Sequence, residues 1–134
     1  MTITYLDVET TFMVGGNRRT DPSPFNSNNK LVSVQYSHDN GPIQFNWFYH
    51  KDMDEMASEM TVGESFNLVQ DVLDKTTVLI GHNIKFDLMW LWESGFNYDG
   101  QVYDTMIGEY TLLRGQKWGL SLFDSCVRRK VALK

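Results

Sequence analysis

Two carboxylates separated by one residue, Asp7 and Glu9, stand near the start of the chain. The apolar residues before them favour an extended strand, on which side chains alternate between the two faces. Asp7 and Glu9 therefore project from one face, with Cα atoms about 6.5 to 7 Å apart. Carboxylates held this close resist joint ionisation, and hard oxygen ligands suit Mg²⁺ or Mn²⁺. The pair predicts either a divalent metal site or, since the pattern is short, the solvated acidic face of an amphipathic strand.

A second polar pair, Asn83 and Asp87, occurs four residues apart later in the chain. The apolar residues around it predict a helix over 83–94, so both side chains lie on one face of the first turns. The start of a helix favours a negative charge or a bound anion. The pair is therefore either part of a site or a capping asparagine followed by an unrelated aspartate.

Alternation of apolar and polar residues predicts the strands that position the first pair. We expect strands over 3–9, 31–37 and 43–49, with a hairpin at the Asp39-Asn40-Gly41 turn. A short β-branched and apolar run over 77–80 predicts a strand buried on both faces.

The remaining segments connect these strands. A helix over 64–75 precedes the buried strand, because its apolar residues recur at helical spacing. Polar residues with glycine and proline indicate a long surface loop over 13–29, and 51–63 is expected to be irregular or partly helical. A helix between the hairpin and a buried strand predicts a mixed sheet in which that strand is parallel to a neighbour.

Composition limits the class of protein. The chain has 134 residues, 42% apolar and 22% charged, which predicts one folded domain over 1–134. The sequence has neither a membrane-spanning apolar run nor a signal peptide pattern, and its single cysteine, Cys126, fits a reducing compartment. We therefore expect a cytoplasmic protein that is not secreted. The net charge of -5 argues against a protein that coats nucleic acid through a basic surface.

Four segments, LDVET, GHNIKFDLMWL, YDTMIGEYTLL and GLSLFDSCV, together resemble the DEDD (DnaQ-like) superfamily of 3′-5′ exonucleases. The likeness is greatest to the proofreading domain of family A DNA polymerases, of the bacterial polymerase I and phage type, and it covers nearly the whole chain. It implies an α/β, ribonuclease H-like fold with a mixed sheet flanked by helices. It also implies removal of nucleotides from the 3′ end of single-stranded or frayed DNA, in a bacterial or phage-infected cell, with a DNA polymerase domain as partner.

The resemblance assigns a role to each member of the two pairs. With two Mg²⁺ or Mn²⁺ ions in the complete site, Asp7 bridges both ions, Glu9 holds the first and orients the attacking water, and Asp87 supports the second. Asn83 positions the terminal nucleotide. Contacts to the sugar and base come from residues that follow the first strand, namely Thr10, Phe12 and Met13.

One element of the family pattern is missing from the sequence. These enzymes carry a fourth carboxylate on a late helix, within Y-x-x-x-D or H-x-x-x-x-D, and no such motif follows GLSLFDSCV. Asp124 has suitable chemistry but lies in the structural L-S-L element, and Asp104 is better explained as a helix N-cap. We therefore expect the N-terminal portion of the domain, without its C-terminal helix and with poor hydrolysis by this polypeptide alone.

The missing helix would leave apolar surface uncovered around a late group of side chains: Leu120, Leu122, Phe123 and Val127. We therefore expect self-association, or a C-terminal portion supplied by another chain. Two other functions stay open, a non-catalytic nucleic-acid-binding remnant and a ribonuclease D-like exonuclease acting on RNA 3′ ends.

Two further groups have structural explanations. The tryptophans at 90, 92 and 118 are expected to be core or partly buried packing residues and not a platform on which bases stack. The basic residues Arg128, Arg129, Lys130 and Lys134 are expected to mark a solvated helix end, where cations offset the helix dipole, with contact to DNA as the alternative.

Overall fold

The computed structural model describes residues 1–14, 20–49 and 55–131, with the backbone alone at 13, 14 and 55–62. Within these residues no helix is long and apolar enough to cross a membrane. The elements in chain order are β1 (Ile3–Thr10), β2 (Met13–Val14), β3 (Thr20–Asp21), β4 (Leu31–His38), β5 (Ile43–Trp47), α1 (Glu55–Lys75), β6 (Val78–Gly81), α2 (Ile84–Glu93), β7 (Gln101–Asp104), α3 (Thr105–Leu112) and α4 (Leu122–Arg129).

Five strands form a mixed sheet in the order β5-β4-β1-β6-β7. The central strand β1 is antiparallel to β4 and parallel to β6, and β7 is parallel to β6. Asp39 and Asn40 of the β4–β5 hairpin both adopt a left-handed conformation, with φ of 51° and 59°. Two such residues are typical of a tight hairpin turn that matches the strand twist. The predicted hairpin and the predicted parallel strand are confirmed.

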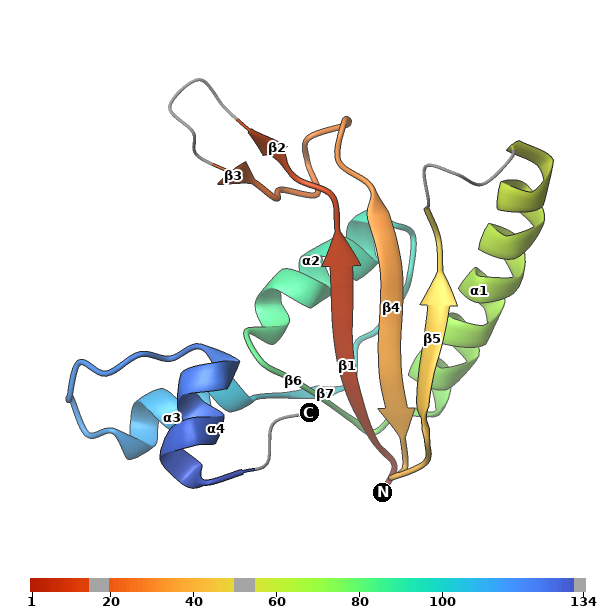
Figure 1. Ribbon diagram of the computed structural model, residues 1–134. Coiled ribbons are helices and arrows are strands. Elements are labelled where there is room, and N and C mark those ends of the chain that lie inside the picture. Colours follow the sequence, from red (N-terminus) through yellow and green to blue (C-terminus); the bar gives the residue numbers. More distant parts are fainter. Residues whose placement is uncertain (15–19, 50–54, 132–134) are drawn as a thin grey trace.

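One face of the sheet carries the hydrophobic core. The helices α1 and α2 pack on this face (Figure 1), against β5 and β1 respectively. Burial alternates along β1: Leu6 and Val8 are buried, whereas Asp7 and Glu9 are exposed. Asp7 and Glu9 therefore share the opposite, exposed face of the sheet, as the strand pattern predicted.

Three segments differ in detail from the sequence-based expectation. The helix α1 begins at Glu55, so the segment 51–63, expected to be irregular or partly helical, is helical from residue 55; its residues are largely good helix formers without an apolar stripe. The strand β6 covers 78–81, and only Leu79 and Gly81 in it are buried, so it is not buried on both faces. The expected loop over 13–29 contains the paired strands β2 and β3.

The strand β7 was not predicted at all. It has four residues, three of them exposed, so neither alternation nor an apolar run signals it. It forms because β6 offers a parallel edge, with Ile80 opposite Tyr103 and Gly81 opposite Asp104. This pairing places the start of α3 beside the start of α2.

The three tryptophans differ in environment. Trp90 is 3% exposed and its indole N–H donates to the carbonyl of Pro22 at 3.0 Å, so its predicted packing is confirmed. Trp92 is 53% and Trp118 is 56% exposed, so neither of these two is a core residue. Trp92 lines the groove beside β7, and its indole N–H donates to the carbonyl of Tyr98 at 3.3 Å. Trp118 lies under the guanidinium of Arg128, 5.4 Å from the ring centroid.

A buried carboxylate joins α3 to α4. Glu109 of α3 accepts hydrogen bonds from Arg129 Nε at 3.0 Å and from the Arg128 guanidinium. These two hydrogen bonds, from Arg129 and then Arg128, hold the pKa of Glu109 below its ordinary value. Arg128 and Arg129 are therefore engaged with α3, which corrects the expectation of a solvated helix end for these two. Lys130 is exposed, and Lys134 lies outside the described residues.

Candidate active site

Polar residues gather where the parallel strands of the sheet end. Asp7 and Glu9 lie in the last half of β1, Asn83 follows β6, and Asp104 ends β7. Because β1, β6 and β7 are parallel, their carboxyl ends lie at one edge of the sheet. Open α/β sheets bind ligands at this edge. The fold therefore brings residues from three separate parts of the sequence to one place.

Asp87 reaches this edge from the first turn of α2. Its Oδ1 accepts a hydrogen bond from the backbone N–H of Val8 at 2.9 Å, across 79 positions of sequence. The register explains why that N–H is available, since β6 pairs with β1 only as far as Tyr5. Asp7 is adjacent to Val8, so this contact brings the carboxylates of Asp7 and Asp87 near each other.

A glycine permits this close approach of α2 to β1. A Cβ at Gly81 would lie 3.0 Å from the carbonyl oxygen of Leu6 and would clash with the side chain of Ile84. Any larger residue would push the β6–α2 turn away from β1. Gly81 thus helps to set the distance between the two halves of the site.

Burial and charge both act on the two aspartates. Asp87 is 2% exposed. Burial, and to a smaller extent the negative charge of Asp7, raises the pKa of Asp87 to about 7, although the hydrogen bond from the Val8 N–H lowers it. Although Asp7 lies on the exposed face, neighbouring protein atoms remove part of its hydration, which raises its pKa. The pair resists joint ionisation, so it is suited to hold a proton or a cation.

Glu9 lies on the same exposed face of β1, two residues beyond Asp7. The register with β4 shifts between Glu9 and Thr10, which marks a bulge at the end of the strand. Within the described residues, no group of three or more His, Cys, Asp or Glu side chains lies close enough to hold a metal ion. The described residues thus bring Asp7 and Asp87 together without a third ligand beside them.

Asn83 occupies the N-cap position of α2 in a left-handed conformation, with φ 59° and ψ 47°, and its side chain makes no capping hydrogen bond. The interpretation of Asn83 as a capping asparagine is therefore wrong. Its side chain is exposed at the edge of the sheet, where it is accessible to a ligand.

The chain matches a known family over most of its length. Residues 20–126 match the model of a 3′-5′ exonuclease family of the DNA polymerase A type. The chain belongs to this exonuclease family. The matched range includes Asn83 and Asp87 and begins after Asp7 and Glu9. None of the curated proteins matches the chain.

A solved structure of the family B DNA polymerase from the hyperthermophilic archaeon Pyrobaculum calidifontis is similar to 69% of this chain, with 18% sequence identity and a TM-score of 0.44. The chain spans about 10% of the length of that polymerase. Family membership and the mixed sheet with flanking helices together identify a ribonuclease H-like α/β fold of the DEDD exonuclease superfamily. The resemblance and the fold class inferred from sequence are confirmed.

The remaining expected site residues of this exonuclease domain lie near the end of β1. Thr10 ends the strand and is partly buried, whereas Phe12 is 57% exposed. The Met13 side chain lies outside the described residues. The backbone here is fixed by two hydrogen bonds between Thr11 and Lys30, of 2.9 and 2.7 Å. The exposed ring of Phe12 is therefore presented from an anchored segment.

Asp104 and Asp124 of the exonuclease domain both make local contacts at the start of a helix. Asp104 Oδ1 accepts from the backbone N–H of Met106 at 2.8 Å, so the predicted N-cap of α3 is confirmed. Asp124 in α4 accepts from the hydroxyl of its N-cap residue Ser121 at 2.8 Å. This local contact agrees with a structural role for Asp124.

A histidine next to the site was not singled out from sequence. His82 donates from Nε2 to the carbonyl of Leu120 at 2.6 Å, and its Nδ1 lies 2.9 Å from the Thr105 hydroxyl. It lies beside Asn83 in the segment GHNIKFD, and this adjacency was the one signal available. Its partners are remote in sequence, so only the structure reveals them.

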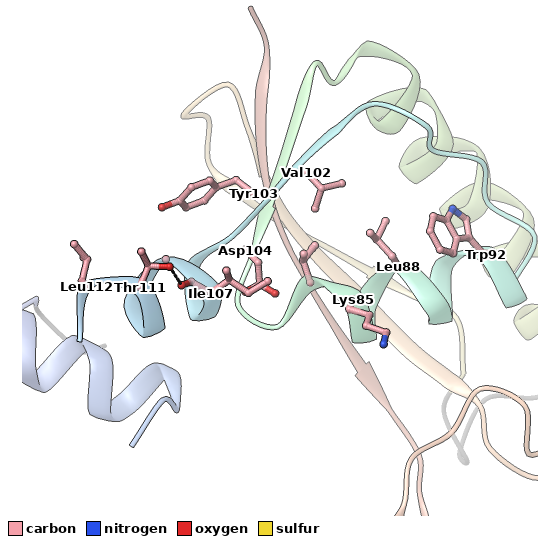
Figure 2. A pocket seen from close by; sticks show the side chains of 11 residues that line it. Lys85, Leu88, Trp92, Val102, Tyr103, Asp104, Ile107, Thr111 and Leu112 are labelled. Atoms are coloured by element: carbon pink, nitrogen blue, oxygen red, sulfur yellow. Dashed lines mark hydrogen bonds between the residues drawn. The ribbon is translucent and has the colours of Figure 1, made fainter. Parts of the chain in front are cut away.

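Two hollows adjoin the site. One of about 520 Å³ lies on the exposed sheet face beside Asp7, between Tyr5, His82 and Leu122. The other, of about 700 Å³, is the groove between α2, β7 and α3 shown in Figure 2, with Asp104 and Lys85 in its wall. The first adjoins Asp7 directly and is the one that a substrate group near the carboxylates would enter.

Proposed function

We propose that this chain is an exonuclease domain of the DNA proofreading type, which removes nucleotides one at a time from the 3′ end of single-stranded or frayed DNA. One observation carries the proposal. Asp7 and Asp87, the acidic members of two motifs in different parts of the sequence, meet at the Val8 amide. Family membership over residues 20–126 supplies the reaction type.

The two carboxylates fit a divalent cation. Asp87 is buried beside Asp7 and its pKa is raised to about 7, so a cation would relieve both the burial and the repulsion. The donors are hard oxygens, which suit Mg²⁺ or Mn²⁺. We propose that Asp7 and Asp87 hold this ion and that Glu9, on the same face of β1, orients the attacking water. When bound, such ions stabilise charge on the attacking and leaving oxygens of a phosphodiester.

The substrate end would lie between β1 and the start of α2. Asn83 presents an exposed polar side chain for the terminal nucleotide, and Phe12 presents an exposed ring on which a base can stack. Stacking on a single aromatic ring suits an unpaired end. We favour DNA over RNA on the family's DNA polymerase type alone.

The test combines metal binding with a degradation assay. Mn²⁺ is expected to bind the wild-type chain and to support slow shortening of a 5′-labelled single-stranded DNA from its 3′ end. Asp7→Ala is expected to weaken Mn²⁺ binding by at least about tenfold, since even partners of metal ligands contribute 10- to 100-fold. Calorimetric titration and gel analysis measure the two quantities.

Asp71→Ala is the matched control, because Asp71 is an exposed carboxylate on α1. It should leave Mn²⁺ binding and DNA shortening unchanged. Metal-independent binding of intact DNA would instead indicate a non-catalytic remnant. Preferential shortening of a labelled RNA of the same sequence would indicate the ribonuclease D-like alternative.

The exposed apolar residues of α4 indicate a surface through which the domain could contact a partner. Phe123 and Val127, one turn apart on this helix, are 64% and 56% exposed, and exposed apolar patches promote association. We propose contact with a polymerase domain, with a C-terminal portion in another chain or, in isolation, with a second copy.

The isolated chain is therefore expected to self-associate. The sedimentation coefficient should rise with protein concentration, and the double variant Phe123→Ser/Val127→Ser should remove that rise while keeping the helical circular dichroism signal. A wild-type chain that sediments as a monomer at every concentration would contradict the expectation.

A further inference from the structure

The backbone at Asn83 adopts a conformation that needs support. Its φ of 59° and ψ of 47° lie in the left-handed region, which is unfavourable for a residue with a Cβ, although asparagine tolerates it better than most. Such a conformation persists only where surrounding contacts hold it. The direction in which the Asn83 side chain points is therefore set by whatever fixes this one residue.

Asp104 supplies the contact. Its Oδ1 accepts the backbone N–H of Asn83 at 2.9 Å and the N–H of Met106 at 2.8 Å. The parallel pairing of β6 with β7 places Gly81 opposite Asp104, so the two strand ends lie side by side. Figure 2 shows Asp104 at the junction of β7, α2 and α3. One carboxylate oxygen thus caps α3 and holds the entry to α2.

A second contact joins the same two strand ends. The hydroxyl of Thr105 donates to the carbonyl of Gly81 at 3.2 Å and lies 2.9 Å from His82 Nδ1. The other nitrogen of His82 donates to Leu120. The two residues before the Asn83 amide are therefore anchored as well, and after it the Asn83 carbonyl accepts the N–H of Phe86 at 3.0 Å within α2. The Asp104 contact is the restraint on the Asn83 amide itself.

We propose that Asp104 is a positioning residue for the exonuclease reaction, which acts through the Asn83 amide to fix the conformation in which Asn83 meets the terminal nucleotide at a free 3′ end. The inference rests on the proposed function, because it takes Asn83 as the contact to that nucleotide. Asp104 itself touches neither the substrate nor the metal ligands in this scheme.

A purely structural role, as the cap of α3, makes a different prediction. Asp104→Ser keeps a good N-cap residue for α3, but its shorter side chain does not span both amides. Asp104→Asn keeps an acceptor oxygen with the original reach. Ser121→Ala is the matched control, since it removes the N-cap contact of α4 to Asp124, 3.0 Å long, without touching Asn83.

The experiment uses two readouts on the full chain. Amide hydrogen exchange, followed by NMR, reports whether the Asn83 N–H is protected. Fluorescence anisotropy compares the affinities for a 5′-fluorescein single-stranded DNA that ends in a 3′-hydroxyl and for the same DNA ending in a 3′-phosphate. The ratio of the two affinities measures recognition of the free end, which a loss of helix stability alone does not change.

Asp104→Ser is expected to expose the Asn83 amide to exchange and to lower the end preference about tenfold. Asp104→Asn should restore both to within about twofold of wild type, and Ser121→Ala should change neither. Unchanged exchange at Asn83 in Asp104→Ser, or an equal loss of end preference in Ser121→Ala, would overturn the proposal. If the wild-type chain has no end preference at all, the end-binding role fails with the proposed function, whereas the exchange data still show whether Asp104 holds Asn83.

Discussion

Asp87→Asn is expected to remove most of a loss of stability that the wild-type chain undergoes as the pH rises from about 4 to about 7. The folded chain raises the pKa of Asp87 from 3.8 to about 7, chiefly by burial. Between these values the folded state keeps a proton that the unfolded state has released, so folding is favoured below pH 4 and this contribution is lost as the pH passes 7. At about 1.4 kcal/mol per pKa unit, the loss amounts to roughly 4 kcal/mol.

The asparagine suits this test because its side-chain oxygen can still accept the Val8 N–H. Urea unfolding of the wild type and Asp87→Asn at pH 4, 5, 6, 7 and 8 measures the effect, and the variant should become the more stable protein near neutrality. The exposed Asp71→Asn is the control and should follow the wild type. Parallel stability curves for wild type and Asp87→Asn would show that burial of this carboxylate is relieved in another way.

Divalent cations should also change the free energy of unfolding through Asp87. At pH 8, Mn²⁺ is expected to stabilise the wild-type chain, because binding to the folded state alone raises the free energy of unfolding. Asp87→Asn removes one of the two proposed ligands and should remove most of this gain. Urea midpoints measured with Mn²⁺ and with chelator therefore link the pH effect to the proposed metal site.

Phe96→Ala is expected to lower the free energy of unfolding by about 3–5 kcal/mol. Phe96 is 2% exposed and contacts both α1 and the segment that follows β5. Its ring stacks on Phe66 of α1, with centroids 4.4 Å apart, and meets the edge of Phe48 at 5.7 Å. Truncation would remove both aromatic contacts and leave a cavity between α1 and the end of α2.

Phe25→Ala provides the matched comparison, since the same substitution is made at a ring that is 67% exposed. It is expected to change stability by less than about 0.5 kcal/mol. Urea unfolding at fixed pH compares the two variants. Similar costs at both positions would contradict the view that Phe96 is central to the core.

The local features of the site follow from the sequence. Alternation along β1 was enough to place Asp7 and Glu9 on one face, because side-chain direction on a strand repeats every two residues. The turn at Asp39 and Asn40 was readable from residue type. Asp104 was identified as an N-cap from its place before a helical segment. Each of these features depends on neighbours within a few residues.

Other features were not predicted correctly because they depend on residues far away in the sequence. The strand β7 has exposed residues and forms on the edge of β6, so its own sequence says little. Trp92 is exposed although it follows the buried Ile84 and Leu88 at a spacing of four residues along α2, because what covers the end of a helix is set by distant segments. The early start of α1 lay in residues without an apolar stripe.

By itself, the sequence determined the strands, the hairpin and the parallel strand through its periodicity, and the residue types of the two motifs; the fold class came from the resemblance of those motifs to an exonuclease family. Only the tertiary structure decided that Asp87 meets the Val8 amide from 79 residues away and that its pKa rises to about 7. It also decided that one oxygen of Asp104 holds Asn83 in a left-handed conformation. These properties arise from burial and from hydrogen bonds between distant segments, which exist only once the strands have paired and the helices have packed on them.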